Sequence, residues 1–593
     1  MIILGINISH NSSACIMING ELKLAIQEER LTKIKNFTGY PKKSIDFCLK
    51  FLKKNHIKAD IACLTTKHLP MLSYKVPIGH FFNIEDYKNF YGKEFYYKKL
   101  RRISTTKYLK NLFNDKRNKF NTYLNFSRYS TKDINKNINH DVMKYLKKQT
   151  KDLVDKIEVI DHHTCHAYYA FYASKINDQK KKHAIITLDS WGDGRNQTVF
   201  IKDTNNQLKL VAESKQCDIA RIYKFVTLIL SMKPDEHEFK VMGLAPYSKF
   251  NYAYTIYKDV FEGLLVVKDC KISFKKRPKD IFEYLTTKLN RYRFDSIAAA
   301  VQIFVEKLVS ELFYQVYKKY KVTSFCLSGG VSMNIKMNKI LSELNFVKEL
   351  YVPPSGGDES LCIGGCYYLE KKRLPLNNIY LGQSISNTNL NDLKNIFKRN
   401  YLIKKNIKHA YIASLLLKGE IVGLARDREE FGARALGNRS ILANPSITNS
   451  VEKINETIKS RDFWMPFALT ILERKHKFFI KNKKNLDSSF MTIGFNTIEK
   501  NYYKIKAGTH PYDKTVRPQI LRKSANLQFY NLIKEFEKIS GIPAILNTSL
   551  NLHGLPIASS LKDIFNVIDS SSLKYLYIND KYLIIKKKQN KLF

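Results

Sequence analysis

Three histidines fall within five positions in the stretch EVIDHHTCHAYYAFYAS, residues 158–174, although the 593-residue chain contains 14 in all. The preceding IEVI is typical of a short buried strand, and the small and apolar residues that follow favour a packed helix. On a helix His162 and His166 share one face because they are four residues apart, whereas His163 points elsewhere. Such a pair can bind a transition metal if a third ligand arrives from another part of the chain. The alternative is a local group satisfied by hydrogen bonds at a helix start.

Four turns rich in glycine or serine follow buried strands, and each is suited to an anionic ligand. Two of them, HNSSA at 10–14 and SWGDGR at 190–195, join the strands of hairpin-like segments. The other two, SGG at 328–330 and PSGGDE at 354–359, stand between a strand and a helix. Glycine lets the backbone approach a ligand, and a helix N-terminus favours anions. Two halves that each begin with such a hairpin are the plan of the actin-like ATPase and sugar-kinase fold.

A change of character near KKRLPLNN, residues 371–378, indicates a linker, because a proline and two asparagines follow a charged helix end. We therefore expect one domain over residues 1–372 and another over 376–593. Within the first, residues of about 64–150 mix aromatic residues with lysines and predict a helical basic insertion. This insertion either covers a ligand cleft or presents solvated basic faces only. The second domain concentrates arginine in segments such as RDREEFGARALGNRS and HPYDKTVRPQILRK.

The net charge of +46 is extreme and at first favours a nucleic-acid partner. The lysines, however, are spread along the chain together with Asn, Ile, Tyr and Phe, a set that AT-rich codons produce, so we favour compositional drift and do not expect nucleic acid to bind. No apolar run of about 18 residues predicts a membrane span, and the N-terminus does not read as a secretory signal. The nine cysteines lack a framework of spacings, which predicts reduced thiols and a cytoplasmic location. The closest pair, Cys362 and Cys366 in CIGGC, fits packing better than metal binding.

Taken together, these motifs resemble those of the ATP-dependent O-carbamoyltransferase family, which includes nodulation-factor and antibiotic-tailoring enzymes. The resemblance implies an α/β protein with an N-terminal actin-like (ASKHA) duplicated domain and a C-terminal YrdC-like α+β domain. The C-terminal domain would make carbamoyl adenylate from carbamoyl phosphate and ATP with Mg²⁺, and the N-terminal domain would transfer the carbamoyl group to a hydroxyl of a sugar or small metabolite. The motifs that carry it are HNSSA (10–14), EERLTKIK (28–35), DHHTCHA (161–167), DSWGDG (189–194), EFKVMGLAPY (238–247), LSGGVSMN (327–334), PSGGDE (354–359), FGARALGNRSI (431–441), RDFWMPFA (461–468), TVRPQ (515–519) and LNTSLN (546–551).

The resemblance also implies a metal site in the N-terminal domain. Its ligands would be His162, His166 and Asp358, and the metal a divalent transition ion, usually thought to be iron. Two imidazoles and a carboxylate suit such an ion with positions left open for a ligand. His163 would then make packing contacts or support the ligands.

Further residues of the N-terminal domain receive catalytic roles from the resemblance. His10, in the first hairpin turn, is the candidate base that deprotonates the acceptor; the alternative is a turn histidine bonded to backbone. Lys35 is expected to meet phosphate, and Asp189 and Asp193 to line the nucleotide or acceptor site. Relatives usually carry Asp after the turn histidine, where this chain has Asn11, so any coupling between an aspartate and His10 is in question.

Anion binding is expected at two places. Gly329 and Gly330 match the nucleotide-side turn of the N-terminal domain, and the C-terminal motifs bring together arginines, a lysine and neutral donors suited to polyanions. Met465 stands where many relatives have another arginine. The C-terminal residues expected to contact carbamoyl phosphate or ATP are Arg434, Arg439, Lys459, Arg461, Arg517, Asn547 and Ser549.

Two other functions compete with carbamoyl transfer to a hydroxyl. One is a tRNA-modifying enzyme of the threonylcarbamoyl-adenosine type, because both domains resemble parts of that machinery. The other is a non-catalytic nucleotide-binding module. The RALGNRS and LNTSLN motifs favour the O-carbamoyltransferase, but the sequence does not identify the acceptor or the oligomeric state.

Overall fold

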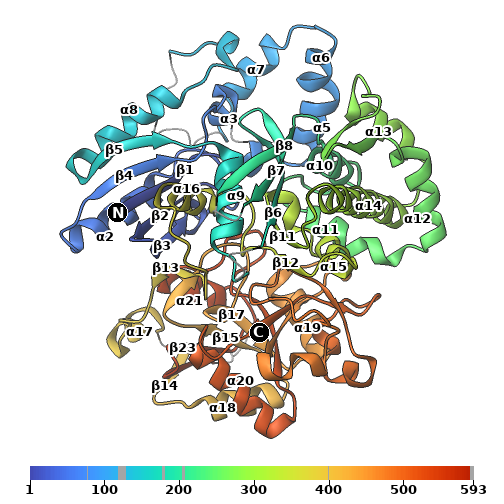
Figure 1. Cartoon of the computed structure of the whole chain (residues 1–593). Helices are drawn as coiled ribbons and strands as arrows, with labels where there is room; N and C mark the ends of the chain where they lie inside the picture. Colours follow the sequence, from blue (N-terminus) through green and yellow to red (C-terminus); the bar gives the residue numbers. More distant parts are fainter. Residues whose placement is uncertain are drawn as a thin grey trace, which may run out of the picture. The chain divides into compact units, whose positions relative to one another are not determined.

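The computed structural model describes residues 1–76, 78–117, 124, 128–176, 181–203, 207–398 and 400–587. The chain divides into two compact units, Met1–Pro375 and Leu376–Phe593, which we call unit 1 and unit 2. Each unit combines sheets with helices (Figure 1), which confirms the mixed α/β class predicted from the sequence.

Unit 1 begins with a five-stranded sheet in the order β3-β2-β1-β4-β5. The first three strands run antiparallel as consecutive hairpins, and β4 and β5 continue the sheet in parallel with β1. Strands β1 and β2 are almost wholly buried, as expected for the centre of a sheet covered on both faces, whereas the edge strand β5 is charged and only partly buried. They comprise β1 (Ile2–Asn7), β2 (Ser13–Ile18), β3 (Glu21–Gln27), β4 (Ala59–Leu64) and β5 (Val154–Val159).

A second sheet repeats this plan. Its order is β8-β7-β6-β11-β12, with β6, β7 and β8 antiparallel and β11 and β12 parallel to β6. Strand order and direction therefore match those of the first sheet one for one. The strands are β6 (His183–Gly192), β7 (Arg195–Lys202), β8 (Leu208–Ser214), β11 (Ser324–Ser328) and β12 (Glu349–Tyr351).

Two helices lie between these sheets (Figure 1): α9 (His162–Tyr172), which follows β5, and α16 (Leu361–Glu370), which follows β12. Helix α16 packs on the first sheet, α9 packs on the second, and the two helices pack on each other. Their close approach depends on glycine, because a Cβ at Gly364 would collide with the backbone of Cys165. Cys362 and Cys366 are buried free thiols that lie against the first sheet, 3.2 Å from Ser13 Oγ and 3.5 Å from Cys15 Sγ of β2, which agrees with the packing interpretation of CIGGC.

The remaining helices of unit 1 surround the two sheets. Residues 64–150 contribute several short helices, and a long helix, α14, supports the second half. These helices are α1 (Glu28–Thr32), α2 (Lys42–Lys54), α3 (Met71–Lys75), α4 (Ile78–Phe81), α5 (Ile84–Asn89), α6 (Tyr96–Leu100), α7 (Thr106–Phe113), α8 (Asn139–Thr150), α10 (Ile219–Ile229), α11 (Glu238–Leu244), α12 (Phe250–Ile256), α13 (Ile281–Leu289), α14 (Phe294–Tyr320) and α15 (Ile335–Glu343); a small hairpin, β9 (Leu265–Lys268) and β10 (Lys271–Phe274), completes the unit.

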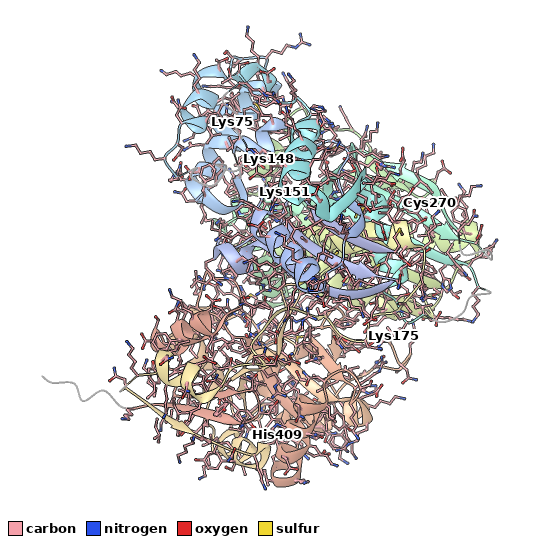
Figure 2. The ribbon with its side chains drawn as sticks, turned by 90° about the vertical axis from the view of Figure 1, so that its left-hand side faces the viewer. Lys75, Lys148, Lys151, Lys175, Cys270 and His409 are labelled. Atoms are coloured by element: carbon pink, nitrogen blue, oxygen red, sulfur yellow. The ribbon has the colours of Figure 1, made fainter. Side chains whose placement is uncertain are left out.

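Lysines of the 64–150 segment come from separate elements. Figure 2 labels two of them, Lys75 of α3 and Lys148 of α8. The Lys75 ammonium lies 4.7 Å from the centre of the Phe113 ring and donates a hydrogen bond to the Tyr129 carbonyl at 3.0 Å. At least one lysine of the basic segment therefore has a structural role within it.

Unit 2 is built on an eight-stranded mixed sheet in the order β14-β24-β23-β15-β17-β22-β18-β21. Its apolar core joins the centre of this sheet to helices α17, α19 and α21. The strands are β13 (Tyr380–Ser384), β14 (Tyr401–Lys404), β15 (Val422–Ala425), β16 (Arg428–Glu430), β17 (Arg439–Ala443), β18 (Ala468–Leu472), β19 (Phe495–Asn496), β20 (Thr515–Val516), β21 (Pro518–Leu521), β22 (Ala544–Ser549), β23 (Tyr575–Ile578) and β24 (Tyr582–Lys586), and the helices are α17 (Leu390–Ile396), α18 (His409–Leu417), α19 (Asn449–Ile454), α20 (Leu527–Ser540) and α21 (Leu561–Asp569).

Within the described residues, no helix combines the length and the apolar character needed to cross a bilayer.

Candidate functional site

Four side chains of unit 1 form one buried cluster: His162, His166, Asp189 and Asp358. One ligand atom from each lies within 4.8 Å of the others. The Asp189 carboxylate is 3.2 Å from His162 Nε2 and 3.0 Å from His166 Nε2, and Asp358 Oδ1 is 3.7 and 3.6 Å from the same two nitrogens. Two imidazoles and two carboxylates are a donor set that divalent transition metals accept. The residues therefore fit the metal site that the family resemblance implies.

Local structure explains how both histidines reach this cluster. Helix α9 begins at His162, with Asp161 as its N-cap accepting a hydrogen bond from the Thr164 amide at 3.0 Å. The four-residue spacing then aligns the two ligands on one face of the helix. His163 is buried on another side, where Nδ1 lies 2.6 Å from Thr187 Oγ1 and Nε2 lies 3.1 Å from the Arg195 carbonyl. Its contacts are structural, and burial followed by the nearby histidines lowers its pKa to about 3.

Electrostatics within the cluster favour a cation. Burial acts to lower the pKa of His166, but hydrogen bonding to Asp189 and Asp358 raises it to about 9. The pKa of Asp189 lies well below its usual range, because the two histidines outweigh the effect of burial. The carboxylates thus attract positive charge at this point, which a proton supplies in part and a divalent ion supplies more fully.

The structure gives contacts for both Asp189 and Asp193, which were expected to line the nucleotide or acceptor site. Asp189 also belongs to the candidate metal cluster. Asp193 accepts hydrogen bonds from the amides of Lys67, His68 and His162, at 3.0, 2.8 and 2.8 Å. Its carboxylate is thus committed to backbone groups, and it fixes the start of the 64–150 segment to the start of α9.

The turn between β1 and β2 is tied directly to this cluster. The Asn7 side-chain amide donates to the carbonyl oxygens of His10 and Asp358, at 3.0 and 2.8 Å, and Ser9 Oγ donates to Asp358 Oδ2 at 3.0 Å. The turn that carries His10 is therefore held beside the loop that carries a metal ligand. Asn11 in the same turn has a left-handed backbone with φ of 49°, and its Oδ1 is buried without a hydrogen-bond partner.

A charged loop, residues 231–238, lies close enough to His10 for the His10 charge to act on Asp235. Asp235 Oδ2 accepts hydrogen bonds from Lys224 Nζ at 2.6 Å and from the Tyr87 hydroxyl at 3.1 Å. Burial acts to raise the pKa of Asp235, but the charges of Lys224 and then His10 lower it. Tyr87 comes from α5, so the 64–150 segment reaches the loop beside the candidate base.

Lys35 is close to the same loop but is paired. Its ammonium lies 2.8 Å from Glu236 Oε1, and Lys233 binds the other oxygen of that carboxylate at 3.0 Å. Although burial acts to raise it, these two lysines lower the pKa of Glu236 to about 2. A phosphate would have to compete with Glu236 for Lys35.

Glycines in the turns of unit 1 serve close packing. A Cβ at Gly329, whose φ is 90°, would collide with the backbone of Leu188, and a Cβ at Gly330 would lie 3.2 Å from Asp189 Oδ1. Gly192 lies directly against the His162 ring, with its Cβ position only 2.6 Å from Nε2. Gly192 and Gly330 of the second half therefore lie directly against residues of the candidate metal cluster.

In unit 2, three of the predicted arginines, Arg434, Arg461 and Arg517, lie close enough for their charges to interact. Burial, and then the charges of Arg434 and Arg461, lower the pKa of Arg517 well below its usual range. Burial also lowers the pKa of Arg461 to about 10. The Nε of Arg517 is buried with no hydrogen-bond partner. Three crowded guanidinium groups are an arrangement that an anion would stabilise.

Lys459, Asn547 and Ser549 lie together at the end of β22. The Lys459 ammonium donates to the carbonyl of Ser549 at 2.5 Å and to Asn551 Oδ1 at 2.5 Å, both of which are neutral acceptors. Asn547 donates to the Ala435 carbonyl at 3.2 Å, and its Oδ1 is buried without a partner.

Arg439 is a different case from the other predicted arginines. It is fully buried, its Nη1 donates to the carbonyls of Arg426 and Asn438, and its Nη2 donates to carbonyls that include Asp427 at 3.1 Å. Both terminal nitrogens are thus committed to backbone carbonyls. We correct its assignment from phosphate contact to support of the β17 turn.

Sequence reasoning missed two features of unit 1. Asp189 ends the buried run of β6, next to the histidine helix, and a carboxylate at the end of such a run was the available signal for a fourth candidate ligand. The contact of Tyr87 with Asp235 had no such signal, because it joins residues 148 positions apart.

Comparison with known proteins agrees with these observations. Residues 2–367 match the family description "Carbamoyltransferase N-terminus", and residues 413–586 match "Carbamoyltransferase C-terminus". An uncharacterized protein of Methanocaldococcus jannaschii is 31% identical over 99% of this chain and 100% of its own length. Nodulation protein NolNO of Sinorhizobium fredii is 24% identical over 98% of this chain and 79% of its own length.

Among solved structures, the similarity is weak. Full-length HypF in its phosphate- and nucleotide-bound form is 12% identical, with a TM-score of 0.34 over 62% of this chain and 46% of that chain. The activator of the 2-hydroxyisocaproyl-CoA dehydratase from Clostridium difficile, with bound ADPNP, gives 12% and 0.32 over 63% of this chain and 95% of that chain. TM-scores this low carry no argument, so the assignment depends on the sequence profiles. With both profiles matched and the first spanning more than half of its residues, the chain belongs to the carbamoyltransferase family.

Proposed function

We propose that the protein makes carbamoyl adenylate in unit 2 and transfers its carbamoyl group to an acceptor hydroxyl in unit 1. Carbamoyl phosphate would be hydrolysed to carbamate and phosphate, and carbamate would attack the α-phosphate of ATP, releasing pyrophosphate. In the second stage the acceptor oxygen attacks the carbamoyl carbon, the bond from that carbon to AMP breaks, and AMP leaves. The family assignment supports carbamoyl transfer; the two stages and the acceptor class are our proposal.

The observation that carries this proposal is the connection between the His10 turn and Asp358. Asn7 and Ser9 hold the two loops together, so neighbouring loops carry the candidate base and a residue of the candidate metal cluster. General-base catalysis requires the base within reach of the acceptor hydroxyl. A divalent ion, which we propose to be Fe²⁺, held by His162, His166, Asp189 and Asp358 would bind adenylate phosphate or polarise the carbamoyl carbonyl when present.

The two units fit different stages. Polyphosphate and carbamoyl phosphate are polyanions, and the crowded Arg434, Arg461 and Arg517 with Lys459 suit them. The repeated strand order of the two sheets of unit 1 supports an actin-like duplicated domain over residues 1–372, and we retain the YrdC-like assignment of residues 376–593 as part of the proposal. Lys35, Gly329, Gly330, Asn547 and Ser549 are proposed ligand contacts.

The experiment that tests the proposal uses the purified full chain with ATP, Mg²⁺ and carbamoyl phosphate but no acceptor. Release of pyrophosphate that depends on carbamoyl phosphate is the expected result. A panel of sugars and polyols is then screened for a mass gain of one carbamoyl group. A requirement for threonine and bicarbonate would instead indicate a tRNA modifier, and absence of pyrophosphate under all these conditions would contradict an enzymatic role.

A further inference from the structure

The imidazole of His10 is held by a threonine rather than by an acid. His10 Nδ1 lies 3.2 Å from Thr38 Oγ1, and Thr38 Oγ1 donates its own hydrogen to the Asn36 carbonyl at 3.3 Å. The carbonyl can only accept, so a Thr38 hydroxyl that donates to it has no second hydrogen for His10 Nδ1. In that arrangement the Thr38 oxygen accepts from the ring, and the proton of the neutral imidazole is on Nδ1.

The consequence lies at the opposite nitrogen. With the proton on Nδ1, Nε2 carries a lone pair, which is the state that a general base needs. Among the residues that the structure describes, His10 Nε2 has no hydrogen-bond partner, whereas Nδ1 has Thr38. The ring is therefore bound at one nitrogen and available at the other.

Gly79 of α4 lies beside the His10 and Thr38 side chains. A Cβ on Gly79 of α4 would lie 3.5 Å from His10 Cε1, 3.6 Å from Nδ1 and 3.7 Å from Thr38 Oγ1. The α4 backbone thus runs beside the Nδ1–Cε1 edge of the ring, at a distance that leaves room for the Thr38 contact. Segment 64–150 and the loop after α1 together fix the orientation of the imidazole.

We propose that Thr38 is the positioning residue that holds His10 as the Nδ1–H tautomer, so that Nε2 takes the proton of the acceptor hydroxyl. This inference rests on the proposed function. In the transfer step the O–H bond breaks, its proton goes to Nε2, and the freed electron pair forms the bond to the carbamoyl carbon while AMP leaves. Thr38 itself does not touch the reacting atoms.

The surroundings suit the positive charge that His10 then acquires. Asp235 is a carboxyl group on which the His10 charge acts. That charge lowers the pKa of Asp235, after the larger effects of burial, which raises it, and of Lys224, which lowers it. Asn11 makes no hydrogen bond to the His10 ring among the described contacts.

Two readouts test Thr38, and the matched variants are Thr38→Val, which keeps the shape, and Thr38→Ser, which keeps the hydroxyl. A control, Thr32→Val, removes a neighbouring threonine hydroxyl that donates to the Glu28 carbonyl at 2.9 Å. The first readout is the ¹⁵N spectrum of the histidine-labelled full chain at about pH 8.5, roughly two units above the ordinary imidazole pKa. The His10 signals are identified by their loss in His10→Asn.

We expect Nδ1 to carry the proton in the wild type, in Thr38→Ser and in Thr32→Val, and the proton to be shared between both nitrogens in Thr38→Val. The second readout is AMP release from supplied carbamoyl adenylate with water as acceptor. General-base catalysis contributes about 10²–10⁴-fold, and partial loss of the correct tautomer should lower kcat about 10-fold in Thr38→Val, with recovery in Thr38→Ser.

A wild-type proton on Nε2 would overturn the inference. So would an unchanged tautomer and kcat in Thr38→Val, or a loss of kcat that Thr38→Ser does not restore. These outcomes differ from failure of the proposed function, in which the wild type itself releases no AMP while the spectrum still reports where the His10 proton lies.

Discussion

Replacing Gly192 with alanine should disable the metal cluster without altering any ligand. The added Cβ would lie 2.6 Å from His162 Nε2 and closer still to Cδ2 and Cγ, whereas ordinary contacts begin at 3.4 Å. The imidazole must therefore move by about 0.8 Å or more, several times the roughly 0.2 Å tolerance of a metal–ligand distance. The ring cannot retreat easily, because His162 is 1% exposed.

The magnitude follows from this displacement. Loss of groups that merely orient a ligand costs about 10–100-fold in metal affinity. Moving the ligand itself should reach at least the upper end, about 100-fold, which corresponds to about 2.8 kcal/mol at roughly 1.4 kcal/mol per factor of ten.

The assay is a competition titration of metal-free protein with Fe²⁺ and a chromophoric chelator under anaerobic conditions. His166→Ala serves as the positive control for loss of a ligand. Gly194→Ala, in the same turn, is the matched control, because nothing lies within 4 Å of its Cβ position. Its φ of 82° adds backbone strain of about 1–3 kcal/mol, so it reports destabilisation without a clash at the site. Wild-type metal affinity in Gly192→Ala, or equal losses in both glycine variants, would refute the reasoning.

Other predictions follow from the same contacts. Asp189→Asn should lower metal occupancy, measured by elemental analysis, to the level of His166→Ala, and normal occupancy would return Asp189 to the acceptor site. Arg517→Ala should remove the rise in melting temperature that pyrophosphate gives the wild type, whereas Arg522→Ala, which breaks a pair with Glu473 at 2.8 Å, should keep it. Burial, and then the charge of Asp235, raise the pKa of Glu238 to about 7, so the free energy of unfolding measured in urea should fall as the pH rises through 7. Glu238→Gln should abolish that fall and should match the wild type near pH 5. A fall of the same size in Glu238→Gln would show that Glu238 is not its source.

The sequence predicted most where chemistry and periodicity coincide. The four-residue spacing placed His162 and His166 on one face of a helix, and the strand-turn pattern of each half predicted hairpins that the two sheets contain. Asp189 was predicted to line the nucleotide or acceptor site and was not predicted as a metal ligand, because a single sequence does not state which way a carboxylate in a strand turns. Arg439 was misassigned because a motif arginine that binds backbone carbonyls has the same sequence signature as one that binds phosphate.

Contacts between distant segments account for the rest. The position of Thr38 against His10 depends on a loop path, and that of Tyr87 against Asp235 depends on how α5 packs on the second half. Neither is encoded in a local pattern. The sequence predicted the presence of a segment over 64–150, but only the folded chain shows that Gly79 and Tyr87 from it approach the candidate base.

The most direct test of the account is to separate the two stages by supplying carbamoyl adenylate to variants of each unit. The account predicts that Arg517→Ala releases no pyrophosphate from ATP and carbamoyl phosphate, yet releases AMP from supplied carbamoyl adenylate at the wild-type rate. His166→Ala should do the reverse, with normal pyrophosphate release and little AMP. If Arg517→Ala also fails with supplied carbamoyl adenylate, or if His166→Ala loses pyrophosphate release, the division of the reaction between units 1 and 2 is contradicted.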